Sequence, residues 1–173
     1  NIVEVGSRGL TIFKYNDIEM NVVDAAGNVK GQKRIMPVFV GKFVFSTANY
    51  KEKDMIAFYL KGNEKALPPT NLEGVAKVVE NEKFDIYSNN KNWKKVLNAD
   101  VMKLLEAFKP NEYLVDLAIS VFDGKVNVMM GYDDPLMILP LQNKYDSKPY
   151  ETYKKDLVLV VKLIEALNKW IIL

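Results

Sequence analysis

The stretch YLVDLAISVFDGKVNVMMGY, residues 113–132, decides the fold because it specifies two antiparallel strands and the turn between them. On both sides of Asp123-Gly124, apolar residues alternate with small or polar ones. This period of two is typical of a strand with one buried face. The Asp-Gly pair is favoured at the two positive-φ positions of a tight hairpin turn. We therefore predict a β-hairpin whose inward-facing residues are Val115, Leu117, Ile119, Val121, Val126, Val128 and Met130.

Six further segments are rich in β-branched and aromatic residues and extend this hairpin into a larger sheet. They are residues 10–15, 18–25, 34–46, 54–62, 75–79 and 83–88. The sequence AGNVKGQ (26–32) has turn chemistry, and two prolines in 63–71 exclude a central strand there. The alternation in 34–46 slips by one residue at Gly41, which indicates either a bulge or a close backbone approach.

Helices are expected at 92–97, at 99–108 and at about 150–171. Asn98 is a suitable N-cap for the second helix, since its side-chain oxygen can accept a backbone N–H at the helix start. The last helix carries two apolar stripes, more than a helix packed singly on a sheet requires. The first stripe is Leu157, Val160, Val161, Ile164 and Leu167, and the second is Leu159, Leu163, Ala166 and Trp170. The prediction is an α+β fold, a mostly antiparallel sheet flanked by a mid-chain helix and a long C-terminal helix, with residues 1–173 as one domain.

Composition excludes several chemistries. The 173 residues are 49% hydrophobic and 27% charged with a formal net charge of +2, which is typical of a globular domain. Cysteine and histidine are absent, so thiol catalysis, a Ser-His-Asp triad and imidazole or thiolate zinc sites are excluded. We expect no cofactor, and the near-neutral charge argues against nucleic acid as a partner.

Carboxylates are the remaining candidates for catalysis. Asp133 and Asp134 in GYDDP follow a strand, where their oxygens could bind a divalent cation. Asp before Pro also commonly begins a turn, and that interpretation is favoured. The alternative function is therefore a metal-dependent hydrolase, which would need several acids in one pocket, drawn from Glu73, Glu80, Asp116, Asp123, Asp133 and Asp134.

The segment SNNK (88–91) matches the Ser-x-x-Lys pattern of penicillin-recognising acyl enzymes. The Ser-Asp-Asn and Lys-Thr-Gly partners of that pattern do not occur in the chain. We interpret Ser88, Asn89 and Asn90 as loop and helix-start residues whose side chains bond to nearby backbone.

Aromatic and terminal residues supply the candidates for interaction. The strand aromatics are assigned to the core, on their spacing: Phe13, Tyr15, Phe39, Phe43, Phe45, Phe58 and Tyr59. Trp93 lies among Lys91, Lys94 and Lys95, a pattern that fits either a solvated helix face or a contact surface. Trp170 and Leu173 belong either to a docked tail or to a subunit or membrane-proximal contact, and the second stripe of the last helix could join two copies of the chain.

Three segments together resemble the bacterial family called domain of unknown function 3137. They are VFVGKF (38–43), EKFDIYSNNKNWKKVLNADVMKLLEAF (82–108) and YLVDLAISV (113–121), and YNDIEM (15–20) is similar to an early segment of that family. The matching residues are Phe39, Gly41, Phe43, Phe84, Ile86, Tyr87, Ser88, Val96, Leu97 and Met102. The resemblance implies a domain that is tethered to the membrane and faces the cytoplasm. It also implies a LemA-type membrane protein as a partner, since members of the family tend to be encoded near LemA-type proteins. No catalytic residues are established for the family, so it assigns none here.

We therefore expect a binding or scaffolding module from a membrane-associated bacterial protein. The chain begins NIVEV without an initiator methionine, so a piece of a longer, membrane-anchored protein is expected.

Overall fold

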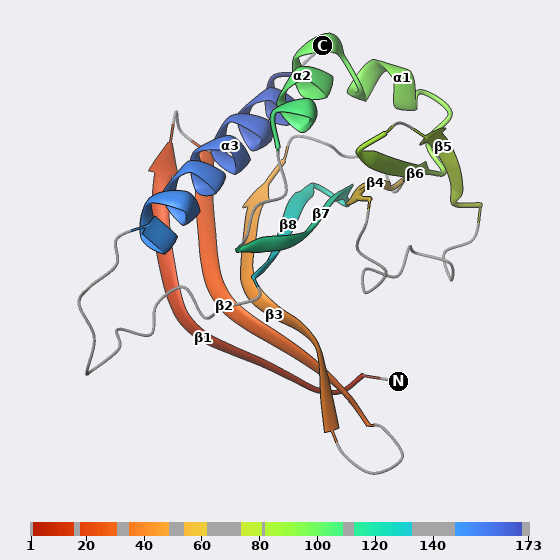
Figure 1. The fold of residues 1–173 in the computed structure, drawn as a ribbon. Helices are drawn as coiled ribbons and strands as arrows, with labels where there is room; N and C mark the ends of the chain where they lie inside the picture. Colours follow the sequence, from red (N-terminus) through yellow and green to blue (C-terminus); the bar gives the residue numbers. More distant parts are fainter. Residues whose placement is uncertain are drawn as a thin grey trace.

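The computed structural model describes residues 2–15, 18–30, 35–48, 54–61, 74–80, 82–108, 113–132 and 148–170. In this part of the chain, eight strands form one antiparallel sheet in the order β1-β2-β3-β8-β7-β4-β6-β5 (Figure 1). The strands are β1 Ile2–Tyr15, β2 Ile18–Lys30, β3 Ile35–Thr47, β4 Ile56–Leu60, β5 Ala76–Glu80, β6 Phe84–Ser88, β7 Leu114–Phe122 and β8 Lys125–Tyr132. The helices are α1 Trp93–Val96, α2 Ala99–Ala107 and α3 Lys148–Trp170. The predicted α+β class with an antiparallel sheet is confirmed.

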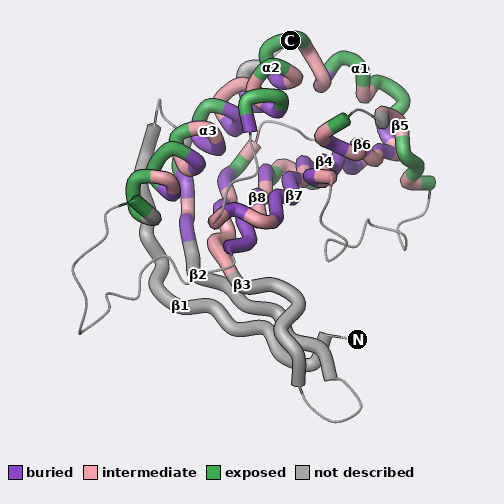
Figure 2. Tube along the Cα trace, in the orientation of Figure 1, coloured by how far each residue is buried: buried purple, intermediate pink, exposed green. Residues whose placement is uncertain are grey.

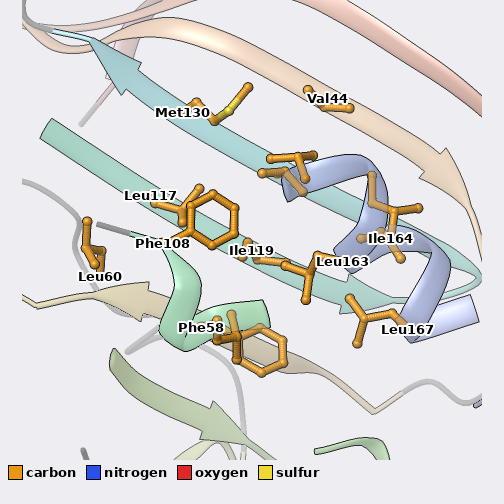
Figure 3. Packing of buried hydrophobic residues seen from close by; sticks show 14 of the residues in the cluster. Val44, Phe58, Leu60, Phe108, Leu117, Ile119, Met130, Leu163, Ile164 and Leu167 are labelled. Atoms are coloured by element: carbon orange, nitrogen blue, oxygen red, sulfur yellow. The ribbon is translucent and has the colours of Figure 1, made fainter. Parts of the chain in front are cut away.

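The core is a single apolar layer between one face of the sheet and the helices (Figure 3). In β6 and most of β8, where the side chains are described, alternate residues are buried in this layer, and α3 lies across it. The layer includes Val44 of β3, Phe58 of β4, Ile119 of β7 and Leu163 of α3, all at most 1% exposed. The second stripe of α3 is therefore partly used inside the chain, where Leu163 is buried, and α2 packs beside α3. Oligomerisation through α3 stays a prediction.

The β7–β8 hairpin forms as predicted, with one correction at its start. Asp123 and Gly124 have φ angles of 46° and 70°, the positive values that the turn requires. A register shift between Leu114 and Asp116 interrupts the β7–β8 ladder. Because of this irregularity Leu114 is fully buried and Val115 only half-buried, so the prediction that Val115 faces the core is wrong.

The first two strands are longer than predicted. β1 begins at Ile2, and β2 continues to Lys30 through residues 26–30, which we had assigned to a turn. In this region β2 is paired on both sides, with β1 and with β3, and these ladders outweigh the local turn preference. The turn-forming pair Gly27/Asn28 instead marks a register shift against β3. Pro37 lies in the part of β3 that pairs with β2 but precedes the β3–β8 ladder, so its missing N–H removes no bond to β8.

Gly41 is a close backbone approach and not a bulge. Neither the β2–β3 ladder nor the β3–β8 ladder shifts register at this residue. Gly41 pairs directly with Gly131, and a Cβ atom on Gly41 would lie 1.9 Å from the carbonyl oxygen of Met130. The register between β3 and β8 therefore requires glycine here.

The helix α2 begins as predicted. The side chain of Asn98 accepts a hydrogen bond from the backbone N–H of Val101 at 2.9 Å, and Asp100 lies in the first turn, near the positive end of the helix dipole. Among the described residues, no helix is both long and apolar enough to cross a membrane.

Gly41→Ala should destabilise the fold by more than about 2 kcal/mol, because the added methyl group can be accommodated only by separating β3 from β8. Gly74→Ala is the matched control. A Cβ there would lie 3.8 Å from the nearest atom, so only the positive φ of 75° opposes it, at about 1 kcal/mol. Urea unfolding monitored by circular dichroism measures both changes, and an unchanged midpoint for Gly41→Ala would refute this register.

Candidate functional site

The SNNK segment is a structural turn, as the loop interpretation predicted. The Ser88 hydroxyl donates to the Met55 carbonyl at 2.9 Å and accepts from the Asn90 N–H at 2.9 Å. Asn89 Oδ1 accepts from the Met55 N–H at 2.6 Å, and Asn90 Oδ1 accepts from the Asn92 N–H at 2.6 Å. These bonds join the end of β6 to the residue before β4 and lead into α1. The Ser88 hydroxyl is buried and engaged on both sides, which does not fit a nucleophile.

Within the described part of the chain, the acids proposed for metal binding do not lie close together. Asp116 is buried in β7, whereas Asp123 is exposed at the tip of the hairpin, and the six residues of extended chain between them separate them by roughly 20 Å. Asp133, Asp134 and Glu73 lie outside the described residues, and Glu80 is placed only by its backbone in β5. Within the described part of the chain, no group of three or more acids could hold a metal ion.

A buried polar cluster links α3 to the sheet. The Tyr132 hydroxyl, at the end of β8, donates to Asp156 Oδ2 of α3 at 3.4 Å. The Tyr153 ring packs edge-on against Tyr132, and Lys42 Nζ of β3 lies 5.5 Å from the Tyr153 ring centroid. Burial raises the pKa of Tyr132, and the nearby Asp156 carboxylate raises it further, so the phenol stays protonated as a donor. Tyr132 and Asp156 are both buried in the interface between α3 and the sheet. The hydrogen bond between them therefore fixes the position of α3.

The face of the sheet that points away from the helices is the candidate interaction surface. Directly paired residues of neighbouring strands share a face, so the ladders define its rows. One row runs through Phe45, Asn127, Ser120, Ala57, Tyr87 and Lys77. The next row runs through Phe43, Met129, Ala118, Tyr59 and Asp85. We call these eleven residues the outer sheet face.

Large side chains flank small ones on the outer sheet face. On β3 the rings of Phe43 and Phe45 lie 5.8 Å apart, and on β4 and β6 the rings of Tyr59 and Tyr87 form an edge-to-face pair at 5.8 Å. Between the two pairs lie the small side chains Ala57, Ala118 and Ser120. All four aromatic residues and Met129 are only partly buried. Such a surface can bind apolar or aromatic groups.

Charged groups border this surface on the β5 side. Asp85 Oδ2 accepts from Lys77 Nζ at 3.0 Å, and Asp85 Oδ1 lies 3.6 Å from Lys61 Nζ. Lys77 also lies 5.9 Å from the centroid of the Tyr87 ring. Burial raises the pKa of Tyr59, with smaller contributions from Tyr87 and the Asp116 carboxylate. Lys61, Lys77 and Asp85 thus form one charged group beside the two tyrosines.

The assignment of all strand aromatics to the core is therefore wrong in part. Phe58 is fully buried, but Phe43, Phe45 and Tyr59 belong to the opposite, outer face. The side chains of Phe13, Tyr15 and Phe39 are outside the described set. Alternation could place residues on two faces, but it could not say which face the helices cover.

The structure describes one of the three predicted interaction residues in full. Trp93 is half-buried at the start of α1 and packs against the core, with Lys94 Nζ 5.5 Å from its ring centroid. Trp170 is the last residue of α3, but its side chain is outside the described set, as is Leu173. Whether those two form a docked tail or a contact stays a prediction.

No protein-family model matches the chain, and no curated protein matches it. A solved structure with the same overall fold is the mycobacterial trehalose monomycolate transport factor A, TtfA. The two superpose with a TM-score of 0.60 at 10% sequence identity, over 96% of this chain and 75% of that chain. At this identity the similarity establishes a shared fold alone.

The Tyr132 cluster predicts a loss of stability in alkaline solution. The pKa of Tyr132 is raised in the folded state, so its contribution is fully present below the unfolded value of about 10 and is lost as the pH rises above it. Tyr132→Phe should therefore flatten the decline of unfolding free energy above about pH 10 by up to about 1.4 kcal/mol per pH unit.

Guanidinium unfolding at several pH values measures this slope. Tyr150→Phe, at an exposed site on α3, is the matched control and should leave the slope unchanged. Equal slopes for wild type and Tyr132→Phe would contradict the role of the buried phenol.

Proposed function

We propose that this chain is a binding or scaffolding domain of a membrane-associated bacterial protein, with no chemistry of its own. The observation that carries the proposal is the outer sheet face, where partly exposed aromatic side chains lie on the side of the sheet opposite to the helices. A binding role explains this surface, and the buried, fully engaged Ser88 removes the main nucleophile candidate.

The chemistry of the outer sheet face supports the proposal. An antiparallel sheet with one face in water normally alternates apolar and polar residues. Here Phe43 and Phe45 of β3, Tyr59 of β4 and Met129 of β8 stand where polar residues would be expected. Partly exposed apolar and aromatic side chains grouped on one face are common at interaction sites.

The wider context of the proposal comes from two resemblances. The family resemblance described above implies a membrane tether, a cytoplasmic position and a LemA-type membrane partner, which we include in the proposal. TtfA, which has the same fold, is named a transport factor for trehalose monomycolate. A role in holding or presenting a partner is consistent with both.

A panel of hydrolase and phosphatase substrates tests the absence of chemistry. The purified protein should give no turnover above background, with or without Mg²⁺, Mn²⁺, Ca²⁺ or Zn²⁺. Robust turnover that disappears in Asp116→Asn, or in Asp133→Asn with Asp134→Asn, would replace the proposal with the carboxylate-based hydrolase.

Two adjacent methionines give a matched test of the outer sheet face. Met130 is fully buried under the helices, so Met130→Ala should cost about 2–5 kcal/mol. Met129 is half-buried on the outer sheet face, so Met129→Ala should cost less than about 1.5 kcal/mol. Urea unfolding measures both, and equal costs would mean that the outer sheet face is a second core and not a surface kept for binding.

A further inference from the structure

The helical side of the molecule carries an excess of positive charge. Residues 91–108 and 148–170 contain nine lysines and five carboxylates, a net charge of +4, whereas the whole chain carries +2. The rest of the chain is therefore net negative, at −2. Figure 2 shows that the outer sides of α1, α2 and α3 are exposed. The charge is thus displayed on one side of the fold and not spread evenly.

The lysines of the helical side differ from those at the outer sheet face in their partners. Lys77 of the outer sheet face and Lys61 beside it both interact with Asp85. Six exposed lysines on the helical side form no ion pair with another described residue: Lys91, Lys94, Lys95, Lys154, Lys155 and Lys162. Their charge is not neutralised within the described fold and is available to an anionic partner.

On α3 the exposed lysines surround apolar side chains. With 3.6 residues per turn, Lys154, Val158 and Lys162 follow one another on the side of α3 opposite to the buried residues Val160 and Leu163. Val158 is 46% exposed at the centre of this side, and Tyr150 is 45% exposed one turn before Lys154. Two exposed apolar or aromatic side chains thus lie among lysines on the outer side of α3, together with the exposed Glu151. Lysine-rich helical surface with exposed apolar groups is of the kind that lies against an anionic lipid–water interface.

The turn before α1 and α1 itself add a second group of cations. Lys91, Lys94 and Lys95 are exposed, and no carboxylate lies between Asp85 and Asp100 in the sequence. Trp93 is half-buried among them, and Lys94 lies over its ring. Tryptophan and tyrosine favour the headgroup region of a bilayer, where an aromatic ring and a polar edge are both solvated. α1 and α3 are in contact, and Figure 2 shows that both helices have exposed outer parts, so the two groups of cations lie on neighbouring exposed helices.

We propose that this side, defined by the six lysines together with Trp93, Tyr150 and Val158, binds the surface of a bilayer rich in anionic phospholipid. The lysines attract the phosphate groups of the lipids, and the three apolar or aromatic side chains enter the headgroup layer. The outer sheet face then points away from the bilayer. The inference deepens the proposed membrane-associated binding role and rests on it for its setting.

Lipid fits these observations better than nucleic acid. A single-stranded nucleic acid is held by a basic groove with several aromatic side chains on which successive bases stack. Here one tryptophan is half-buried, and the exposed Val158 gives a phosphate backbone nothing to bind. Val158 and Tyr150 instead suit an interface with acyl chains and headgroups.

Co-sedimentation with extruded vesicles tests the proposal. The protein should bind vesicles of phosphatidylcholine with about one third phosphatidylglycerol at about 0.1 M NaCl, and the binding should fall steeply at about 0.5 M NaCl. Pure phosphatidylcholine vesicles should retain little protein. Equal binding to both vesicle types, or none to the anionic vesicles, would overturn the proposal.

Paired substitutions locate the surface. Lys94→Gln with Lys95→Gln, and separately Lys154→Gln with Lys155→Gln, should each lower the vesicle partition coefficient about 10- to 30-fold, since each surface lysine contributes about fivefold. Lys77→Gln with Lys125→Gln removes the same charge from the outer sheet face and the hairpin tip and should leave the partition coefficient unchanged. Thermal unfolding verifies that all three variants are folded.

The remaining outcomes separate this inference from the proposed function. An equal loss of vesicle binding in the control pair would show nonspecific attraction and overturn the inference. Fluorescence anisotropy with a labelled oligonucleotide provides the competing result, since tight nucleic-acid binding without vesicle binding would do the same. Neither outcome affects the substrate panel or the two methionine variants, so the binding-domain proposal stands or falls independently.

Discussion

The structure depends on the register between β3 and β8, because that pairing decides which face of the sheet receives the helices. Gly41 lies against Gly131 with no room for a side chain, and the ladder continues without a shift to Thr47. This register points Val44 and Val128 into the same layer as Leu163 of α3. A slip of one residue would exchange the two faces and expose the whole apolar set. The backbone contact at Gly41 therefore supports the one core that holds strands and helices together.

The core lies on one side of the sheet. The other features either hold the helices and strands in position or form exposed surfaces. The Ser88–Asn90 turn and the Tyr132–Asp156 contact hold β4, β6 and α3 in position, and their polar groups are used by the fold. The outer sheet face and the lysines of the helical side are not needed for that support. They lie on opposite sides of the sheet, which is the arrangement expected of a scaffold with two separate contacts.

The sequence predicted correctly those elements that depend on a few neighbouring residues. The Asp123-Gly124 turn, the Asn98 cap and the length of α3 depend on a few neighbouring residues, and all were predicted to within two residues. The inward position of Val115 and the turn at 26–30 failed because distant strands decide them, through a register shift and through pairing on both sides of β2. The outer sheet face could not be predicted, since alternation in β3 shows two faces without showing which one Leu163 covers. Lys94 and Lys154 are far apart in the sequence, and only the fold brings their helices, α1 and α3, into contact.

Native-state hydrogen exchange tests the dependence on one core most directly. If the β3–β8 register and the α3 layer form a single cooperative unit, the slowest amides should be those of Gly41–Thr47, β7, β8 and the buried side of α3. They should all share one opening free energy, and Leu163→Ala should lower it for all of them by the same amount. Exchange of α3 amides at a much lower free energy than the central strands, with those strands unaffected by Leu163→Ala, would contradict the account.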